Sequence, residues 1–243
     1  MAPAALGARH SLTPLSCDPR EATDSRQARD VSLVTVMLNN AAVRRAVSGI
    51  VDPVAKGLLR IGLSPDAVTL IGTIATCAAA LWFFPRQQWV AGTLVIAAFV
   101  VADLLDGTMA RLSGRSGPWG AFLDSTLDRV ADGAIFGGVV LGLALSGDTL
   151  SAAACLLALV GGGVVSYAKA RAESIGVECD VGIAERAERV ILLLVATLLT
   201  GLGVPYVLPT AVWILVVLTW VTVGQRILHV RRQLRAIPTQ DAA

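Results

Sequence analysis

Charged side chains are scarce in this 243-residue chain. Asp, Glu, Lys and Arg make up 16% of it, whereas hydrophobic residues make up 55%. The mean hydropathy is +0.69. These values exclude an ordinary soluble domain, and several apolar runs approach the roughly 20 residues needed to cross a bilayer. The composition predicts an all-α, polytopic membrane protein.

Histidine and cysteine are also rare, and their positions exclude two kinds of site. His10 and His229 are too few and too far apart for a zinc site. The four cysteines have no short metal-binding spacing, and two fall in apolar runs, which argues against a disulfide framework. They are Cys17, Cys77, Cys155 and Cys179. Any metal is therefore expected to be a hard cation with oxygen ligands.

The first 30 residues lack a periodic apolar face, and they also lack a basic region followed by a long apolar core. We therefore expect residues 1–30 to be a disordered cytosolic tail and not a cleaved signal peptide. Between residues 31 and 63, apolar residues recur at helical spacing with basic residues on the other side. This predicts an amphipathic juxtamembrane helix, bound either to the anionic lipid surface or to the protein's own cytosolic face.

The segment Ser64-Pro65-Asp66 has the pattern of a helix start, with an N-cap, a proline at the first position and an acid in the first turn. Six apolar spans follow, and helix continues from the second span through Arg111. The spans are expected at about 67–84, 89–102, 119–145, 150–172, 185–200 and 208–227. We assign residues 64–232 to this six-helix domain and residues 233–243 to a cytosolic tail.

Basic residues are nearly absent from one set of connections. The loops opposite the termini carry Arg86 alone, whereas the side with the termini and the 111–118 and 169–189 loops holds nearly every other Lys and Arg. The positive-inside rule therefore places both termini and those two loops in the cytosol. A multi-pass protein of the cell membrane is expected.

Four carboxylates interrupt the second and third spans at helical spacing: Asp103, Asp106, Asp124 and Asp128. Such charges cost ~2.5–3.5 kcal/mol each on insertion scales, so a cluster of four indicates a function. In an antiparallel hairpin all four would meet within about two turns of the cytosolic loop. Divalent metal would relieve their repulsion, and carboxylate-bridged metal pairs are common in phosphoryl chemistry.

A structural alternative for these acids is a buried ion network, for instance with Arg111 and Arg129. Asp132, one turn beyond Asp128, is expected to orient the helix or to support the ligands, and not to bind metal itself.

The pattern Asp-x2-Asp-Gly-x2-Ala-Arg-x8-Gly-x3-Asp-x3-Asp spans residues 103–128 and resembles the signature of the CDP-alcohol phosphotransferase family. When the six-span layout is included, the resemblance covers approximately residues 45–235. It implies transfer of a phosphatidyl group from a CDP-linked lipid to an alcohol, with release of CMP.

The resemblance also implies roles for single residues. Asp103, Asp106, Asp124 and Asp128 would bind two divalent ions, Mg²⁺ with Mn²⁺ as the alternative, which hold the diphosphate of the CDP-lipid. Asp128 would also act as general base toward the attacking hydroxyl. The implied nucleotide contacts are Asp66, Ala67, Val68, Thr69, Gly107, Arg111 and Gly117, with Ser116 as a substitute for the last.

Basic residues at the cytosolic ends of the fourth to sixth spans predict a second phosphate site, because arginine suits a phosphate dianion. The candidates are Ser166, Lys169, Arg171, Arg186 and Arg226. Segments 166–173 and 185–189 resemble bacterial family members that use inositol 1-phosphate. The implied donor is CDP-diacylglycerol, the product phosphatidylinositol phosphate and the assembly a homodimer. Ordinary positive-inside anchoring is the alternative for each basic residue.

Three other functions stay open. Glycerol 3-phosphate is the alternative acceptor within the same chemistry, which would make the chain a phosphatidylglycerophosphate synthase. A transporter coupled to protons or divalent ions would also need intramembrane acids, but such sites usually lie near the midplane, beside broken helices or between repeats. Here the acids lie toward one face and no repeat is evident. A membrane scaffold is the third possibility.

Overall fold

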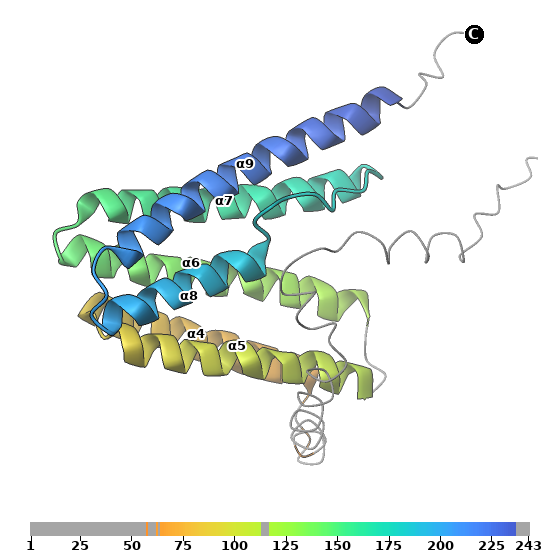
Figure 1. Cartoon of the computed structure of the whole chain (residues 1–243). Coiled ribbons are helices and arrows are strands. Elements are labelled where there is room, and N and C mark those ends of the chain that lie inside the picture. The colour runs from red at the N-terminus through yellow and green to blue at the C-terminus, as the bar shows by residue number, and fades with distance from the viewer. Residues whose placement is uncertain (1–56, 58–61, 63, 113–116, 237–243) are drawn as a thin grey trace, which may run out of the picture.

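The computed structural model describes residues 57, 62, 64–112 and 117–236, and for 102–112 and 236 it describes the helix course alone. The tail expected before residue 31 lies outside this part, as does the amphipathic segment of 31–63 except for residues 57 and 62. From residue 64 onward, the described secondary structure is entirely helical (Figure 1). The elements are α4 (Pro65–Phe83), the 3₁₀ turn η2 (Phe84–Arg86), α5 (Trp89–Leu112), α6 (Pro118–Leu145), α7 (Thr149–Ser174), α8 (Arg186–Gly201) and α9 (Val207–Ala236).

Helix α4 begins as the sequence predicts. Ser64 is the N-cap, and its Oγ accepts a hydrogen bond from the backbone N–H of Ala67 at 3.2 Å. Pro65 takes the first helical position and Asp66 lies in the first turn. The cap satisfies one of the N–H groups that have no partner inside the helix, and the acid interacts favourably with the helix dipole.

Helix α9 is longer than expected, since it continues to Ala236 and so includes the first residues assigned to the C-terminal tail. Residues 228–236 contain neither glycine nor proline, and the next proline is Pro238. With no breaker in this stretch, the helix has no local reason to end at residue 227.

The helices run alongside one another, and their connections alternate between two ends of the molecule (Figure 1). One end holds η2 and the turns before α7 and α9. The other holds the end of α5, the start of α6 and the loop between α7 and α8. Both halves of the aspartate signature therefore lie at the same end, as predicted.

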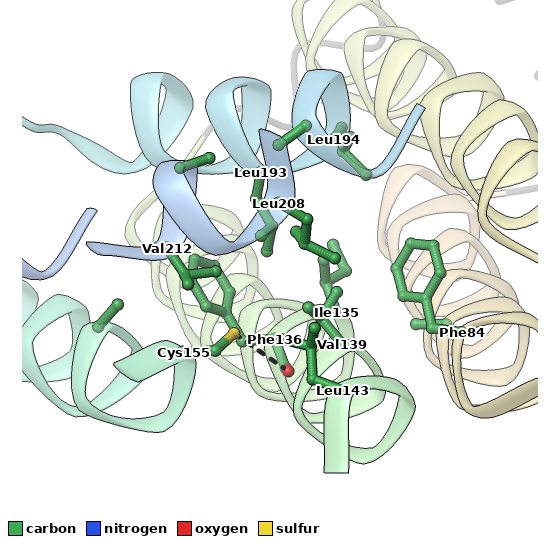
Figure 2. Packing of buried hydrophobic residues seen from close by; sticks show 14 of the residues in the cluster. Phe84, Ile135, Phe136, Val139, Leu143, Cys155, Leu193, Leu194, Leu208 and Val212 are labelled. Carbon is green, nitrogen blue, oxygen red and sulfur yellow. Dashed lines mark hydrogen bonds between the residues drawn. The ribbon is translucent and has the colours of Figure 1, made fainter. Parts of the chain in front are cut away.

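A large apolar cluster joins the helices, with α7 packed against α9 and α4 packed against both α5 and α6. Figure 2 shows side chains from α6, α8 and α9 pointing into a common space, among them Phe136, Leu193 and Val212. Cys155 of α7 lies at the edge of this group, and its thiol donates to the carbonyl of Phe136 at 3.8 Å. Packing of this kind supplies most of the stability of a helical domain.

Three helices in the described residues are long and apolar enough to cross a membrane. They cover Pro65–Arg86, Thr149–Ser174 and Val207–Arg235, with a shorter apolar helix at Trp89–Val101. Large apolar side chains remain exposed along them, such as Ile74 and Val217, which are 59% and 60% exposed. Surfaces of this kind are stable in contact with lipid and are rare on soluble monomers.

At Gly138, α6 approaches the backbone of α4 closely. A Cβ atom at this position would lie 2.5 Å from the carbonyl oxygen of Ala80 and 3.3 Å from the ring of Phe84. At the preceding Gly137, a Cβ would meet no atom within 4 Å. An alanine at either glycine changes helix propensity in the same way, but only at Gly138 does it also clash with α4. Comparing the two substitutions therefore isolates the effect of packing.

We expect Gly138→Ala to destabilise the protein by ~1–3 kcal/mol, because the added methyl group forces the two backbones apart. Gly137→Ala is the matched control and should leave the unfolding temperature nearly unchanged. Thermal unfolding in detergent measures both. Equal effects of the two substitutions would show that α4 and α6 do not approach at Gly138.

Candidate active site

An open cavity of about 730 Å³ lies between α6, α7, α8 and α9, near the end that carries the aspartate signature. Its lining is rich in both signs of charge. The acidic residues are Asp128, Asp132, Glu173 and Glu185, and the basic ones are Arg129, Lys169, Arg186, Arg189 and Arg226. Such a lining can hold a charged molecule and keep it oriented.

The two signature acids of α6 differ in their surroundings. Asp124 is exposed and has no ion pair among the described residues, whereas the Asp128 side chain is 20% exposed and lines the cavity. Arg186 Nη1 lies 2.8 Å from Asp128 Oδ1, and Arg129 Nη2 lies 3.9 Å from Oδ2. Asp128 is therefore a carboxylate already held by positive charge.

An ion network surrounds Asp128, which is the structural alternative stated for the acids. It includes Arg129, as expected, and also Arg186. Arg186 Nε donates to Asp132 Oδ1 at 3.1 Å, and Arg129 Nη2 lies 3.8 Å from Asp132 Oδ2. Arg129 also donates to the hydroxyl of Ser166. The side chain of Arg111 lies outside the described residues. Of the two signature acids whose side chains are described, the network includes Asp128 and not Asp124.

Some of the residues expected to contact the nucleotide lie where the first turns of α4 and α6 meet. The indole N–H of Trp119 donates to Asp66 Oδ2 at 3.2 Å and so joins the first turns of the two helices. Gly117 is the exposed N-cap of α6. Ala67 and Val68 are half-buried, and the buried Thr69 hydroxyl donates to the carbonyl of its own helix at residue 65, at 3.1 Å.

The other signature residues lie on the last turns of α5. These are Asp103, Asp106, Gly107 and Arg111, whose side chains are outside the described part of the chain. Only the helical course of this segment is described, and it ends on the same side of the molecule as the start of α6 (Figure 1).

Carboxylate oxygens are the donors that a hard divalent cation prefers, and Asp124 and Asp128 offer them on successive turns of α6. The described residues contain no group of three side chains that could hold a metal ion. These two acids therefore fit such an ion as half of a site, and the acids at the end of α5 would have to supply the remaining ligands.

The residues expected at the acceptor phosphate fall into two groups. Ser166, Lys169, Arg186 and Arg226 line the cavity. Arg171 does not, and it is exposed and donates to Ser174 Oγ at 3.2 Å.

Lys169 and Arg226 are both tied to the loop between α7 and α8. The ammonium group of Lys169 contacts Asp180 of that loop and lies 4.0 Å from Glu173. Arg226 is 4% exposed and donates to the carbonyls of Val165, at 2.6 Å, and Val181, at 2.8 Å. Arg226 therefore joins three parts of the chain as well as lining the cavity.

Arg189 is a cavity residue that the sequence analysis did not single out. It is 2% exposed, and its Nη1 donates to the carbonyl of Ala184 at 3.1 Å. Gly162 of α7 makes room for it, since a Cβ there would lie 3.2 Å from Arg189 Nε. The spacing of three residues between Arg186 and Arg189 places both on one helix face, and this signal could have identified the second arginine.

The loop of residues 175–185 holds Arg186 at the start of α8. At Gly182 the backbone has φ of +146°, and a Cβ would lie 2.5 Å from the methyl group of Thr222, so glycine is required. The N–H of Ala184 donates to Thr222 Oγ1 at 3.1 Å. Cys179 is fully buried, and loss of hydration raises the pKa of its thiol. The loop is therefore packed onto α9.

The model of the CDP-alcohol phosphatidyltransferase family matches residues 63–224, which include every described cavity residue except Arg226. The chain belongs to this family. It is an enzyme of this type, as the aspartate signature predicted, and transport or scaffolding as its sole role is not supported.

Relatives in the family share most of the chain. A phosphatidylinositol phosphate synthase of Streptomyces avermitilis is 50% identical over 205 residues, which cover 81% of this chain and 84% of that protein. The crystal structure of Mycobacterium tuberculosis phosphatidylinositol phosphate synthase with CDP-DAG bound is 42% identical, has a TM-score of 0.73, and matches over 74% of this chain and 93% of that one. A second structure of that protein, in complex with manganese and citrate, has the same identity and TM-score and covers 75% and 89%.

Thr222→Val tests whether the loop positions the start of α8. The substitution keeps the size of the side chain but leaves the buried N–H of Ala184 without its acceptor, at an expected cost of ~1–3 kcal/mol. Thr219→Val is the matched control, because the equally buried Thr219 hydroxyl donates to carbonyls of its own helix.

Thermal unfolding and limited proteolysis within residues 175–185 report the outcome. We expect faster cleavage and a lower unfolding temperature for Thr222→Val alone. If both substitutions behave alike, the hydrogen bond to Ala184 does not hold the loop.

Proposed function

We propose that this enzyme transfers the phosphatidyl group of CDP-diacylglycerol to inositol 1-phosphate, forming phosphatidylinositol phosphate and CMP. The observation that carries the proposal is the cavity in which the signature residue Asp128 lies beside Arg186, Lys169 and Ser166. A carboxylate next to a basic pocket suits an acceptor that must lose a hydroxyl proton while its phosphate is held. Relatives that are named phosphatidylinositol phosphate synthase support this choice of acceptor.

The signature acids would hold two divalent ions, Mg²⁺ or Mn²⁺. Their positions are Asp103 and Asp106 on α5 and Asp124 and Asp128 on α6. When bound, these ions supply positive charge to the diphosphate of the donor and to the leaving phosphate. The manganese in the structure of the relative supports a divalent ion.

The donor's nucleotide would bind where α4, α5 and α6 meet. Its contacts would be Asp66, Ala67, Val68, Thr69, Gly107, Arg111 and Gly117. The hydrogen bond between Trp119 and Asp66 supports this location, because it holds an exposed carboxylate beside the N-terminus of α6. A helix N-terminus favours a nearby anionic group.

In the reaction, a hydroxyl oxygen of the acceptor forms a bond to the lipid phosphorus of the donor. The bond from that phosphorus to the bridging oxygen breaks, and CMP leaves with the electron pair. Asp128 takes the hydroxyl proton as general base. Arg186, 2.8 Å from this carboxylate, holds it in place.

The acceptor's phosphate would be bound by Ser166, Lys169, Arg186 and Arg226. An arginine carries five N–H donors, so Arg186 and Arg226 can keep their contacts and still donate to a phosphate. Arg171 lies outside the cavity lining. For this residue we favour anchoring at the membrane surface over acceptor binding.

In the membrane, the six helices would all span the bilayer, with the active site and both termini in the cytosol. The domain would cover residues 64–232, preceded by the amphipathic segment of 31–63 and a disordered tail, and followed by a short cytosolic tail after the end of α9. The charge difference between the two ends of the molecule supports this orientation. We also propose a homodimer, which the mass of the detergent-solubilised protein tests.

The acceptor assay tests the proposed function directly. Purified protein is given CDP-diacylglycerol with inositol 1-phosphate or glycerol 3-phosphate, and CMP release is measured with Mg²⁺ or after chelation. We expect faster release with inositol 1-phosphate and none without a divalent ion. Preference for glycerol 3-phosphate would make the enzyme a phosphatidylglycerophosphate synthase. Ion flux into liposomes with no CMP release under any condition would favour a transporter.

Asp128→Asn should lower kcat by about 10²–10⁴-fold, because the amide of asparagine cannot take the hydroxyl proton. The matched control is Asp148→Asn. Asp148 accepts a hydrogen bond from the N–H of Ser151 at 3.0 Å and caps α7 at the opposite end of the molecule. The control should lose some stability and keep its turnover. Equal turnover in the two variants, measured by CMP release, would exclude Asp128 as the base.

A further inference from the structure

Asp132 is a buried carboxylate that the family signature does not include. It lies one turn beyond Asp128 on α6, and its side chain is 10% exposed, compared with 20% for Asp128. A carboxylate at this depth is unfavourable unless it is paired and hydrogen-bonded. Its partners therefore indicate what it does.

Both oxygens of Asp132 face arginines that also contact Asp128. Oδ1 accepts from Arg186 Nε at 3.1 Å, while Nη1 of the same guanidinium lies 2.8 Å from Asp128 Oδ1. Oδ2 lies 3.8 Å from Arg129 Nη2, which is 3.9 Å from Asp128 Oδ2. Two carboxylates on successive turns are thus bracketed by two guanidinium groups, one from α6 and one from α8.

Because Asp128 and Asp132 share these two arginines, the side chains of Arg129 and Arg186 are held in one orientation. Arg129 and Arg186 line the cavity, and their side chains are 35% and 31% exposed, so ion pairs limit the rotations that such long side chains otherwise have. Removal of Asp132 would leave Asp128 as the carboxylate that both guanidinium groups contact. The acid proposed as general base, whose two oxygens already lie 2.8 Å from Arg186 and 3.9 Å from Arg129, would then no longer share these arginines with a second carboxylate.

The fold does not use all the donors of Arg129. Its Nε is buried and has no hydrogen-bond acceptor within the part of the chain that the structure describes. Another group of the same side chain donates to Ser166, itself an expected contact of the acceptor phosphate. Arg129 therefore belongs to the same side of the cavity as that predicted site.

We propose that Asp132 is a positioning residue, which holds Arg129 and Arg186 over the cavity as a pair that binds the acceptor's phosphate and limits their hold on Asp128. The inference rests on the proposed transfer reaction and adds Arg129 to its acceptor site. An incoming phosphate meets two oriented guanidinium groups, while Asp128 stays accessible to the hydroxyl. Preorientation of this kind lowers the entropic cost of binding.

A merely structural role for Asp132, as a link between α6 and α8, leads to different measurements. Loss of a structural link lowers stability and affects both substrates alike. Loss of the positioning role affects the acceptor in particular. The Michaelis constants for the two substrates therefore separate the alternatives.

The test compares Asp132→Asn, which keeps the shape of the side chain and removes its charge, with the capping control Asp148→Asn. For Asp132→Asn we expect the KM for inositol 1-phosphate to rise about tenfold or more, kcat to fall, and the KM for CDP-diacylglycerol to change by less than about twofold. Arg129→Lys should raise the same acceptor KM, and it serves as the second variant if Asp132→Asn does not fold.

A second measurement does not depend on turnover. The rise in unfolding temperature caused by inositol 1-phosphate should persist in the wild type and in Asp148→Asn, and it should be lost in Asp132→Asn and Arg129→Lys. Equal changes in the two Michaelis constants, or an acceptor-induced rise kept in both variants, would overturn the positioning role.

The wild-type protein distinguishes failure of this inference from failure of the proposed function. If it prefers glycerol 3-phosphate, the comparison is made with that acceptor, since both carry a phosphate. If it releases no CMP with either, the proposed function is wrong, and the temperature shift with inositol 1-phosphate alone decides the role of Asp132.

Discussion

The structure depends on charge compensation within an apolar helical bundle. Asp128, Asp132, Arg129 and Arg186 lie between helices, where single charges are unfavourable, and each is stabilised by the others at distances of 2.8–3.9 Å. The surrounding packing is arranged to bring them together. The loop of residues 175–185 is packed onto α9 and places the first residue of α8 opposite α6. Breaking one of these contacts therefore affects chemistry and stability together.

The elements of the fold were largely predictable. Ser64, Pro65 and Asp66 mark the start of α4 by local rules alone, and apolar runs bounded by Gly and Pro set most other boundaries. The end of α9 was not predictable from hydropathy, because the helix continues through charged residues after the apolar run has ended. Membrane burial determines where the apolar run ends, whereas helix propensity determines where the helix ends. Here the helix ends later than the apolar run.

For the site, the sequence pattern is more specific for the acids than for the bases. A signature with fixed spacing specifies which faces of α5 and α6 carry carboxylates. Basic residues have no such pattern. Arg171, Arg186 and Arg226 were all expected at the cytosolic ends of spans, yet the first is exposed, the second is ion-paired and the third donates to backbone carbonyls from within α9. Arg189 was missed although its spacing of three residues from Arg186 places the two on one face of α8. Which arginine faces the cavity is decided by contacts between helices that are distant in the sequence, and these contacts cannot be obtained from local spacing.

The cavity is open and lies toward the ends of four helices, beside apolar surfaces that are themselves exposed. Its position has a consequence for how the two reactants meet. A polyol phosphate dissolves in water and a nucleotide-linked lipid resides in the membrane, and neither enters the other's phase at useful concentration. A site at the boundary between the two phases lets the first arrive by diffusion through water and the second by lateral diffusion within the leaflet. The two reactants then meet at the membrane surface without either of them leaving its own phase.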